Sequence, residues 1–171
     1  MSSGRRIVEI PLEKKIERIL VHRKFTVTTA ESCTGGLIAA SLVNADGISA
    51  VFKEGYITYS NEAKVKLLGV KEETLARFGA VSRETAKEMA EGAAKASGAE
   101  AAIAVTGIAG PGGGTPEKPV GLVYIGCHVN GKTVVKRCFY GGDRDNVRHM
   151  AAKEALELLY CQILSEEEND R

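Results

Sequence analysis

The amino-acid sequence predicts an α/β protein of three layers, α/β/α, with a mixed sheet in the middle. Three features of the 171 residues lead to this fold class. Helical hydrophobic patterns alternate with β-rich runs in the first half, which is typical of strands joined by helices. Residues 101–105 form a continuous apolar run, as in a strand buried on both faces. Two later β-rich runs flank Asn130-Gly131, which predicts a tight antiparallel hairpin.

The first half of the chain is predicted to alternate helices and strands. Hydrophobic spacing identifies the helices, and Ser60 and Ser82 are suited to cap two of them because a serine hydroxyl accepts a backbone N–H at a helix start. Glycines mark several helix ends. The predicted elements are a helix from Pro11 with the proline early in its first turn, a strand that begins at Thr26 and leads into a polar elbow before Gly35-Gly36, a helix over 37–43, a strand over 56–59, and helices over 61–69, 72–78 and 82–98.

The second half is predicted to contain more strands and to end in a helix. β-rich runs cover residues 120–129 and 133–140, on either side of the hairpin turn. Asp143 is suited to cap the last helix. The acidic segment 165–171 is predicted to be a frayed tail. The chain length favours a single domain over residues 1–171.

Composition and charge exclude several classes of partner. Lys and Arg total 23 against 22 Asp and Glu, and a formal net charge of +1 offers no broad attraction to nucleic acid or to an anionic membrane. No apolar run approaches the ~20 residues of a transmembrane helix, and the N-terminus lacks an apolar signal segment. The four cysteines show no C-x-x-C spacing and no neighbouring histidine cluster, so no metal site is expected. We therefore expect a cytoplasmic protein.

The elbow around Ser32 is the first candidate for chemistry. It lies between a β-rich run and a helix, where the free N–H groups of the first helical turn point at whatever occupies the turn. Ser32 is a candidate nucleophile there, and Thr34, Gly35 and Gly36 are candidate substrate contacts. Cys33 is an alternative nucleophile if the helix start lowers its pKa. The competing interpretation is that Ser32 or Thr34 only caps the helix, the commoner use of a hydroxyl at that position.

A glycine-rich loop over residues 106–121 is the second candidate. It is not a nucleotide-binding P-loop, because Gly113 stands where the phosphate-binding lysine should be, and no G-x-G-x-x-G motif opens a helix. The loop follows a buried strand, the usual place for a ligand to meet an α/β sheet. Its glycines and prolines favour a lid or cradle over a plain connection. The candidate ligand contacts in it are Thr106, Gly107 and Gly110.

Two further pairs of side chains complete the predicted site. Tyr59 ends a β-rich run and Lys64 follows within one helical turn, where burial and the positive helix end would lower the lysine pKa enough for it to accept a serine proton. Arg144 and Arg148 are spaced i, i+4 at a helix start and could clamp a phosphate. The alternatives are a solvated surface lysine and surface arginines paired with nearby aspartates.

Six short motifs occur in order along the chain. They are TAESCTGG at 29–36, YSNEAK at 59–64, GAVS at 79–82, TGIAGP at 106–111, KPVG at 118–121 and GDR at 142–144. Together they resemble the CinA C-terminal domain family, the nicotinamide mononucleotide deamidases, over roughly residues 12–164. Many members carry an additional N-terminal domain, so this chain looks like the stand-alone form. One departure is that relatives often have Gly-Ser-Ser where this chain has Gly47-Ile48-Ser49.

The resemblance implies hydrolysis of the carboxamide of nicotinamide mononucleotide to the acid and ammonia, without a metal or redox cofactor. The family's serine, tyrosine and lysine positions carry over to Ser32, Tyr59 and Lys64, with Ser49 as a further active-site serine. Between the serines we favour Ser32 as the nucleophile, because its elbow offers backbone donors for an oxyanion. The phosphate of the mononucleotide is expected at Arg144, with Arg148 and the amides of 107–110.

A second class of function stays open on the sequence alone. The older name of the family that the chain resembles ties it to competence and DNA damage, and a fold can be retained without its activity. The chain could therefore be a non-catalytic ligand-sensing or partner-binding module linked to those processes. The presence of Ser32, Tyr59 and Lys64 favours the enzyme. We also expect a homo-oligomer whose partner is a small mononucleotide, with neither nucleic acid nor membrane bound.

Overall fold

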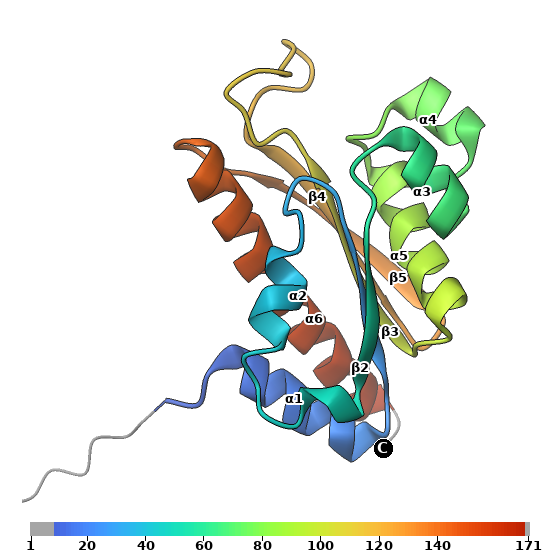
Figure 1. Ribbon diagram of the computed structural model, residues 1–171, viewed down its shortest axis with the longest axis vertical. Coiled ribbons are helices and arrows are strands. Elements are labelled where there is room, and N and C mark those ends of the chain that lie inside the picture. Colours follow the sequence, from blue (N-terminus) through green and yellow to red (C-terminus); the bar gives the residue numbers. More distant parts are fainter. Residues whose placement is uncertain (1–8, 170–171) are drawn as a thin grey trace, which may run out of the picture.

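The computed structural model describes residues 9–169, with side chains described through residue 166. Helices and strands alternate through the first part of the chain, and a strand hairpin and a long helix follow (Figure 1). In chain order the elements are α1 (Leu12–Arg23), β1 (Val27–Glu31), α2 (Leu37–Leu42), the 3₁₀ helix η1 (Ile48–Ala50), β2 (Phe52–Ile57), α3 (Asn61–Leu68), α4 (Glu72–Phe78), α5 (Arg83–Ser97), β3 (Ala101–Gly107), β4 (Leu122–Val129), β5 (Lys132–Phe139) and α6 (Arg144–Asn169).

The predicted three-layer fold with a mixed sheet is confirmed. The strand order is β2-β1-β3-β4-β5, in which β2, β1 and β3 run parallel and β4 and β5 are antiparallel to their neighbours. Figure 1 shows α1, α2 and α6 on one face of the sheet and α3, α4 and α5 on the other. Within residues 9–169 the helices are too short or too polar to cross a membrane.

The middle strands are those that the sequence marked as apolar. Every residue of β1 is buried, and so is β3 except for its last residue, because helices cover both faces of these strands. The hairpin between β4 and β5 turns at Asn130 and Gly131, whose φ angles of 47° and 86° suit a tight turn between twisted strands. This turn places Cys127 opposite Val134.

Helix α5 packs unusually closely against its neighbours. A Cβ atom added at Gly126 of β4 would lie 2.3 Å from the carbonyl oxygen of Ala86, and one at Gly92 of α5 would lie 1.9 Å from that of Leu68 in α3. The core on this face is accordingly built of small residues, with Ala90 and Ala93 of α5 fully buried. The absence of side chains at Gly126 and Gly92 therefore lets α5 lie close to β4 and to α3.

Three predicted boundaries need correction. The second strand covers 52–57 and ends before Thr58, because β2 pairs with β1 in parallel from Val27 to Glu31 and the chain turns away after Ile57. Pro11 lies at the N-cap of α1, one position before the helix. The segment predicted as a frayed tail is helical over 165–169, and residues 170 and 171 lie outside the described part.

One contact joins the last turns of α6 to the sheet. Glu166 is buried, and its carboxylate accepts a hydrogen bond from the ammonium of Lys132 on β5 at 2.9 Å. Charges near a helix end are usually solvated, but here the ion pair ties that end to the sheet. The acidic composition of the segment gave no sign of this partner.

Candidate active site

A cavity of about 260 Å³ lies at the carboxyl ends of β1 and β3. In Figure 1 the elbow after β1, the loop after β3, and the starts of α3 and α6 meet at this end of the sheet. Connections at the carboxyl ends of parallel strands are the usual ligand site of such sheets. Of the predicted residues, the cavity is lined by Ser32, Tyr59, Lys64, Thr106, Gly107, Gly110 and Arg144.

Ser32 and Lys64 are in direct contact at the base of this cavity. The amine nitrogen Nζ of Lys64 lies 3.1 Å from Oγ of Ser32, and also 2.7 Å from the carbonyl oxygen of Thr58 and 3.3 Å from that of Tyr59. A neutral amine has two N–H donors and one lone pair. The two carbonyls can take both donors, which directs the lone pair to the serine hydroxyl.

The environment of Lys64 makes its neutral form more accessible than it is for a lysine in water. The side chain is 1% exposed, and burial lowers its pKa from 10.5 to about 8, opposed only by weaker charge effects of Cys33 and Glu62. No carboxylate lies among the residues that line the cavity, so no ion pair holds the ammonium form there. The predicted competing interpretation, a solvated surface lysine, is therefore wrong.

The elbow itself is held by a residue that the sequence interpretation missed. Glu31 is fully buried, and its carboxylate accepts hydrogen bonds from the backbone N–H groups of Gly36, Ile38 and Ala39 at 2.9, 3.1 and 2.9 Å. These are the amides of the start of α2, which we expected to face the substrate. An acidic residue before a helix was the available signal, since carboxylates favour helix N-termini.

The predicted substrate contacts of the elbow therefore need correction. Thr34, Gly35 and Gly36 do not line the cavity, and the start of α2 is already occupied by the Glu31 carboxylate. The two glycines have φ angles of 60° and 106°, which are costly for residues with a side chain. Their role is to let the chain turn sharply after Ser32.

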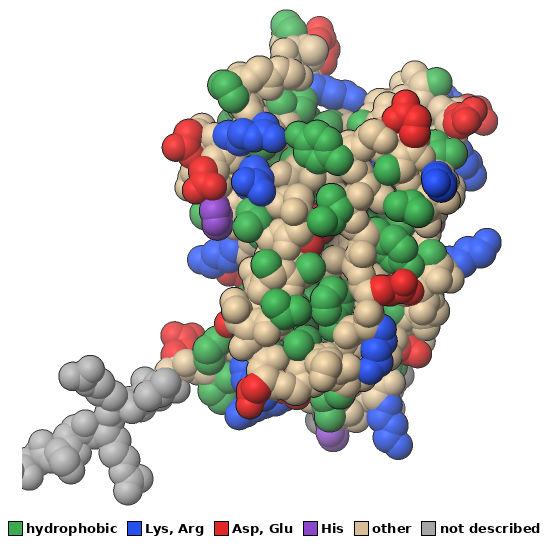
Figure 2. Space-filling view, viewed as in Figure 1, with side chains coloured by type: hydrophobic (Ala, Val, Ile, Leu, Met, Phe, Trp, Pro, Cys, Tyr) green, Lys and Arg blue, Asp and Glu red, His purple; other side chains and the backbone are tan. Residues whose placement is uncertain are grey.

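Tyr59 and Arg144 lie together at the rim. The guanidinium of Arg144 donates from Nη2 to the phenol oxygen of Tyr59 at 3.1 Å and from Nη1 to the carbonyl oxygen of Gly110 at 2.7 Å. Both acceptors are neutral, so the positive charge of Arg144 meets no carboxylate at these contacts. Figure 2 shows Lys and Arg side chains over the start of α6, with Asp or Glu side chains on one side of them and hydrophobic side chains on the other. Arg144 is thus suited to an anionic ligand.

Arg148 does not reach the cavity. Its guanidinium donates from Nε to the carbonyl oxygen of Cys33 at 3.0 Å and from Nη2 to that of Thr34 at 3.1 Å. The i, i+4 spacing places both arginines on one face of α6, but the guanidinium of Arg148 is bound to the elbow and not directed into the cavity. The predicted clamp of Arg144 and Arg148 at one ligand is therefore wrong, because only Arg144 of the two lines the cavity.

The glycine-rich loop forms the far wall of the cavity. Thr106 is buried and donates its hydroxyl to the carbonyl oxygen of Ala80 at 2.8 Å, so it braces the wall. A Cβ at Gly107 would lie 2.7 Å from a Val123 methyl, and one at Gly110 would lie 2.6 Å from a Val120 methyl. Among residues 9–169 the N–H group of Gly110 donates no hydrogen bond, and Gly110 lines the cavity.

Ser49 is not part of this site within one chain. It lies in η1, which precedes β2, whereas Ser32 follows the end of β1. Because β1 and β2 run parallel, these positions are at opposite edges of the sheet. Ser49 is exposed, and its carbonyl oxygen accepts from the amine of Lys53 at 2.6 Å. Its expected role as a further active-site serine is therefore corrected.

Two further possibilities were a reactive Cys33 and a metal site. Cys33 is buried, and desolvation raises its pKa to about 11, so it is a neutral thiol and the alternative of a low-pKa nucleophile is excluded. Within the described residues no group of three or more His, Cys, Asp or Glu side chains could hold a metal ion.

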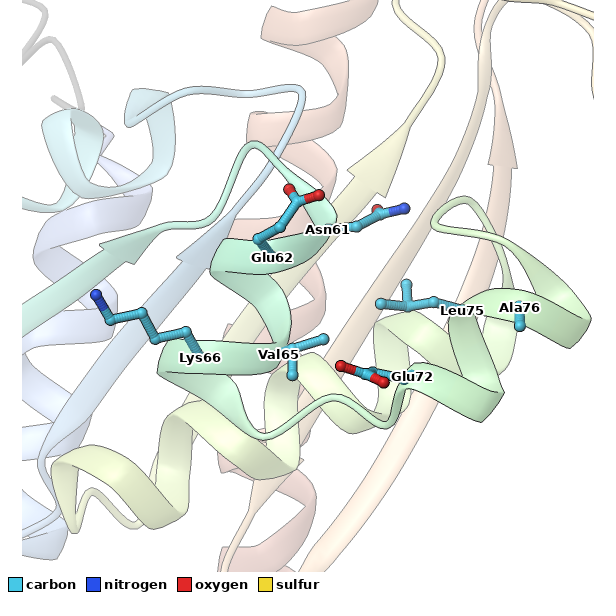
Figure 3. A pocket seen from close by; sticks show the side chains of 7 residues that line it. All are labelled: Asn61, Glu62, Val65, Lys66, Glu72, Leu75 and Ala76. Atoms are coloured by element: carbon cyan, nitrogen blue, oxygen red, sulfur yellow. The ribbon is translucent and has the colours of Figure 1, made fainter.

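A larger cavity of about 420 Å³ lies between α3 and α4, away from Ser32. Figure 3 shows Val65 and Leu75 facing each other across it, with the carboxylate of Glu72 near both. No Ser, Thr or Cys lines it, and its lining consists of exposed or half-exposed side chains. The smaller cavity holds the buried pair of reactive groups, and we take it as the candidate active site.

Fold and site together define an α/β protein that carries a buried serine–lysine pair at the carboxyl edge of a mixed sheet. Residues 9–163 match the model of the CinA C-terminal domain. The chain belongs to this family, as the resemblance in the sequence indicated.

Relatives and solved structures agree with this assignment. A CinA-like protein of Kosmotoga olearia is 59% identical over 156 residues, which are 91% of this chain and 38% of that protein. The chain thus spans under two fifths of the length of such curated relatives. The competence/damage inducible protein CihA of Agrobacterium tumefaciens shares 45% identity and a TM-score of 0.81, over 94% of this chain and 98% of that one. A CinA superfamily protein of Klebsiella pneumoniae shares 37% identity and a TM-score of 0.86, over 90% and 96%.

Proposed function

We propose that this protein hydrolyses the carboxamide of nicotinamide mononucleotide to nicotinic acid mononucleotide and ammonia. The observation that supports the proposal most is the 3.1 Å contact between Lys64 Nζ and Ser32 Oγ in a cavity that also contains Arg144. A buried serine paired with a base is the arrangement of a nucleophilic hydrolase. The resemblance of the six sequence motifs to the deamidases supplies the substrate.

The first half of the proposed reaction forms an ester on Ser32. The neutral amine of Lys64 takes the hydroxyl proton as Oγ attacks the carboxamide carbon, and the carbonyl oxygen becomes an oxyanion. The oxyanion can accept from backbone N–H groups of the loop wall, such as that of Gly110. When the C–N bond breaks, the Lys64 ammonium returns the proton to the departing nitrogen, which leaves as ammonia.

The second half releases the acid. A water molecule enters where the ammonia left, and Lys64 takes its proton as the oxygen attacks the ester carbon. The C–O bond to Ser32 breaks, and Oγ recovers the proton from the Lys64 ammonium. The product leaves the serine as the carboxylic acid and then loses its own proton to water. With a pKa of about 8, roughly one Lys64 in ten is neutral at pH 7, which is sufficient for a general base.

The charge of the cavity supports an anionic substrate. Lys64 and Arg144 line it and no Asp or Glu does, so a cationic substrate without an anionic group would meet only repulsion. The phosphate of the mononucleotide can displace the Tyr59 hydroxyl and the Gly110 carbonyl from Arg144, because a charged acceptor binds a guanidinium more strongly than a neutral one.

A direct assay tests the proposal. The protein is incubated with nicotinamide mononucleotide, and ammonia and nicotinic acid mononucleotide are both quantified, with Ser32→Ala as the control for a contaminating amidase. We expect equal amounts of the two products from the wild type and neither from the variant. No turnover by the wild type, or equal turnover by Ser32→Ala, would contradict the proposal and favour a binding module.

A further inference from the structure

The buried carboxylate of Glu31 is not used by the proposed chemistry. It is 0% exposed and lies at the end of β1, directly before Ser32. Its Oε2 accepts from the N–H groups of Gly36 and Ile38, and its Oε1 accepts from that of Ala39. The Glu31 side chain therefore connects the residue before Ser32 to the start of the helix after it.

The arrangement matches the chemistry of a carboxylate. An ionised carboxylate only accepts hydrogen bonds, and the amides of a first helical turn only donate. Three such contacts in the interior would each be costly to leave unmade. A glutamine of the same shape has one acceptor oxygen, so its amino group would face at least one of these N–H groups, donor against donor.

The opposite side of the elbow is held by a donor. Arg148 binds the carbonyl oxygens of Cys33 and Thr34, and the backbone of Ser32 donates to Val105 of β3 at 3.0 Å. The carboxylate of Glu31 on β1 thus accepts from backbone N–H groups after Ser32, and the guanidinium of Arg148 on α6 donates to backbone carbonyl oxygens there. Little freedom remains for the position of Ser32.

We propose that Glu31 is a positioning residue that, together with Arg148, holds Ser32 Oγ within reach of Lys64. The expected effect on turnover rests on the proposed function. The effect on the reactivity of Ser32 does not, because that reactivity can be measured with a reagent that is not a substrate. The N–H groups at the start of α2 are then occupied by the Glu31 carboxylate, so the substrate phosphate binds elsewhere.

The test compares Glu31→Gln with Glu100→Gln. Glu100 is the matched control, because its carboxylate accepts from the N–H and hydroxyl groups of Thr26 at the other end of β1. Each variant is treated with an aryl sulfonyl fluoride, and the labelling rate of Ser32 is followed by intact mass with Ser32→Ala as the blank. The values of kcat and KM for nicotinamide mononucleotide and the melting temperature are measured in parallel.

We expect Glu31→Gln to lower both the labelling rate and kcat by about 10-fold to 100-fold with KM nearly unchanged, since small misplacements of a nucleophile have effects of this order. Glu100→Gln should leave the labelling rate and kcat at the wild-type values. A folded Glu31→Gln that labels at the wild-type rate would overturn the proposal and reduce Glu31 to a helix cap. A wild-type Ser32 that resists labelling would overturn it as well.

The design separates this proposal from the proposed function. If labelling depends on Glu31 while the wild type does not turn over the mononucleotide, the positioning role stands and the substrate assignment fails. If Glu31→Gln does not fold, Arg148→Gln decides the matter, because it removes the donors on the other side of the elbow. The same loss of labelling then supports the proposal, and unchanged labelling overturns it.

Discussion

Lys64 and Ser32 are 32 positions apart in the chain, yet their side chains share a buried hydrogen bond of 3.1 Å. The contact exists because β1 and β2 are parallel neighbours, so the elbow after β1 and the start of α3 after β2 meet at one edge of the sheet. Thr58 and Tyr59, in the connection between β2 and α3, supply the carbonyls that orient the amine. The following predictions test what this pair does.

Removing either member of the pair should abolish turnover. Ser32→Ala and Lys64→Met should each lower kcat by about 10⁴-fold or more while the protein stays folded, and the double variant should be little worse than either single one. Steady-state ammonia release with circular dichroism as a check on folding measures this. Multiplicative losses in the double variant would show that the two residues act independently.

Activity should rise with pH through the lysine titration. Because the base is the neutral amine, kcat/KM should increase up to an apparent pKa near 8 and then level off. The measurement is a pH–rate profile from pH 6 to about 9.5. Tyr59→Phe is the control, since it removes the phenol that Arg144 contacts but leaves Lys64 in place, and the rise in kcat/KM should keep the same midpoint. A profile that is flat across this range would exclude Lys64 as the base.

The free energy of unfolding should also depend on pH through the titration of Lys64. The pKa of Lys64 is about 8 in the folded protein and near the ordinary 10.5 when unfolded, so between these values the unfolded chain binds more protons. The free energy of unfolding therefore gains a contribution as pH rises through this window. Urea titrations of the wild type and Lys64→Met should differ by an amount that increases in favour of the wild type from pH 8 to 10.5. A constant difference would contradict the assignment.

Substitution of the two arginines of α6 should affect different kinetic constants. Arg144→Ala should raise KM for the mononucleotide about 10-fold to 100-fold, because a charge-assisted contact contributes ~1.5–3 kcal/mol, and should scarcely change turnover of the phosphate-free riboside. Arg148→Ala should instead lower kcat on both substrates, since Arg148 contacts only the elbow. Equal losses on both substrates in Arg144→Ala would remove it from phosphate binding.

Two glycine substitutions should distinguish packing from strain. A Cβ at Gly92 would lie 1.9 Å from the Leu68 carbonyl oxygen, so Gly92→Ala must displace α3, which carries Lys64. We expect a loss of about 1–3 kcal/mol in stability and a clear loss of activity. Gly98→Ala meets open space but has a φ of 71°, so it should lose about 1 kcal/mol with normal activity. Thermal melts and ammonia release measure both effects.

Much of the fold follows from local patterns. The serine caps at Ser60 and Ser82, the buried run of β3 and the turn at Asn130-Gly131 all lie where short-range signals placed them. Cap hydrogen bonds and tight turns involve residues within a few positions of each other, so the sequence alone determines them. The order of the motifs was sufficient to identify the family.

The tertiary structure alone decided which candidates meet. Ser32, Tyr59 and Lys64 come together because the parallel pairing of β1 and β2 brings their connections to one edge, and the same pairing sends Ser49 to the other. Arg144 joins them because it follows β5, which two successive antiparallel pairings set in the same direction as β3. Glu31 and Arg148 illustrate the same limit. Whether a charged side chain faces substrate or backbone depends on which unsatisfied N–H and C=O groups the fold places beside it, and those partners come from elements far apart in the chain.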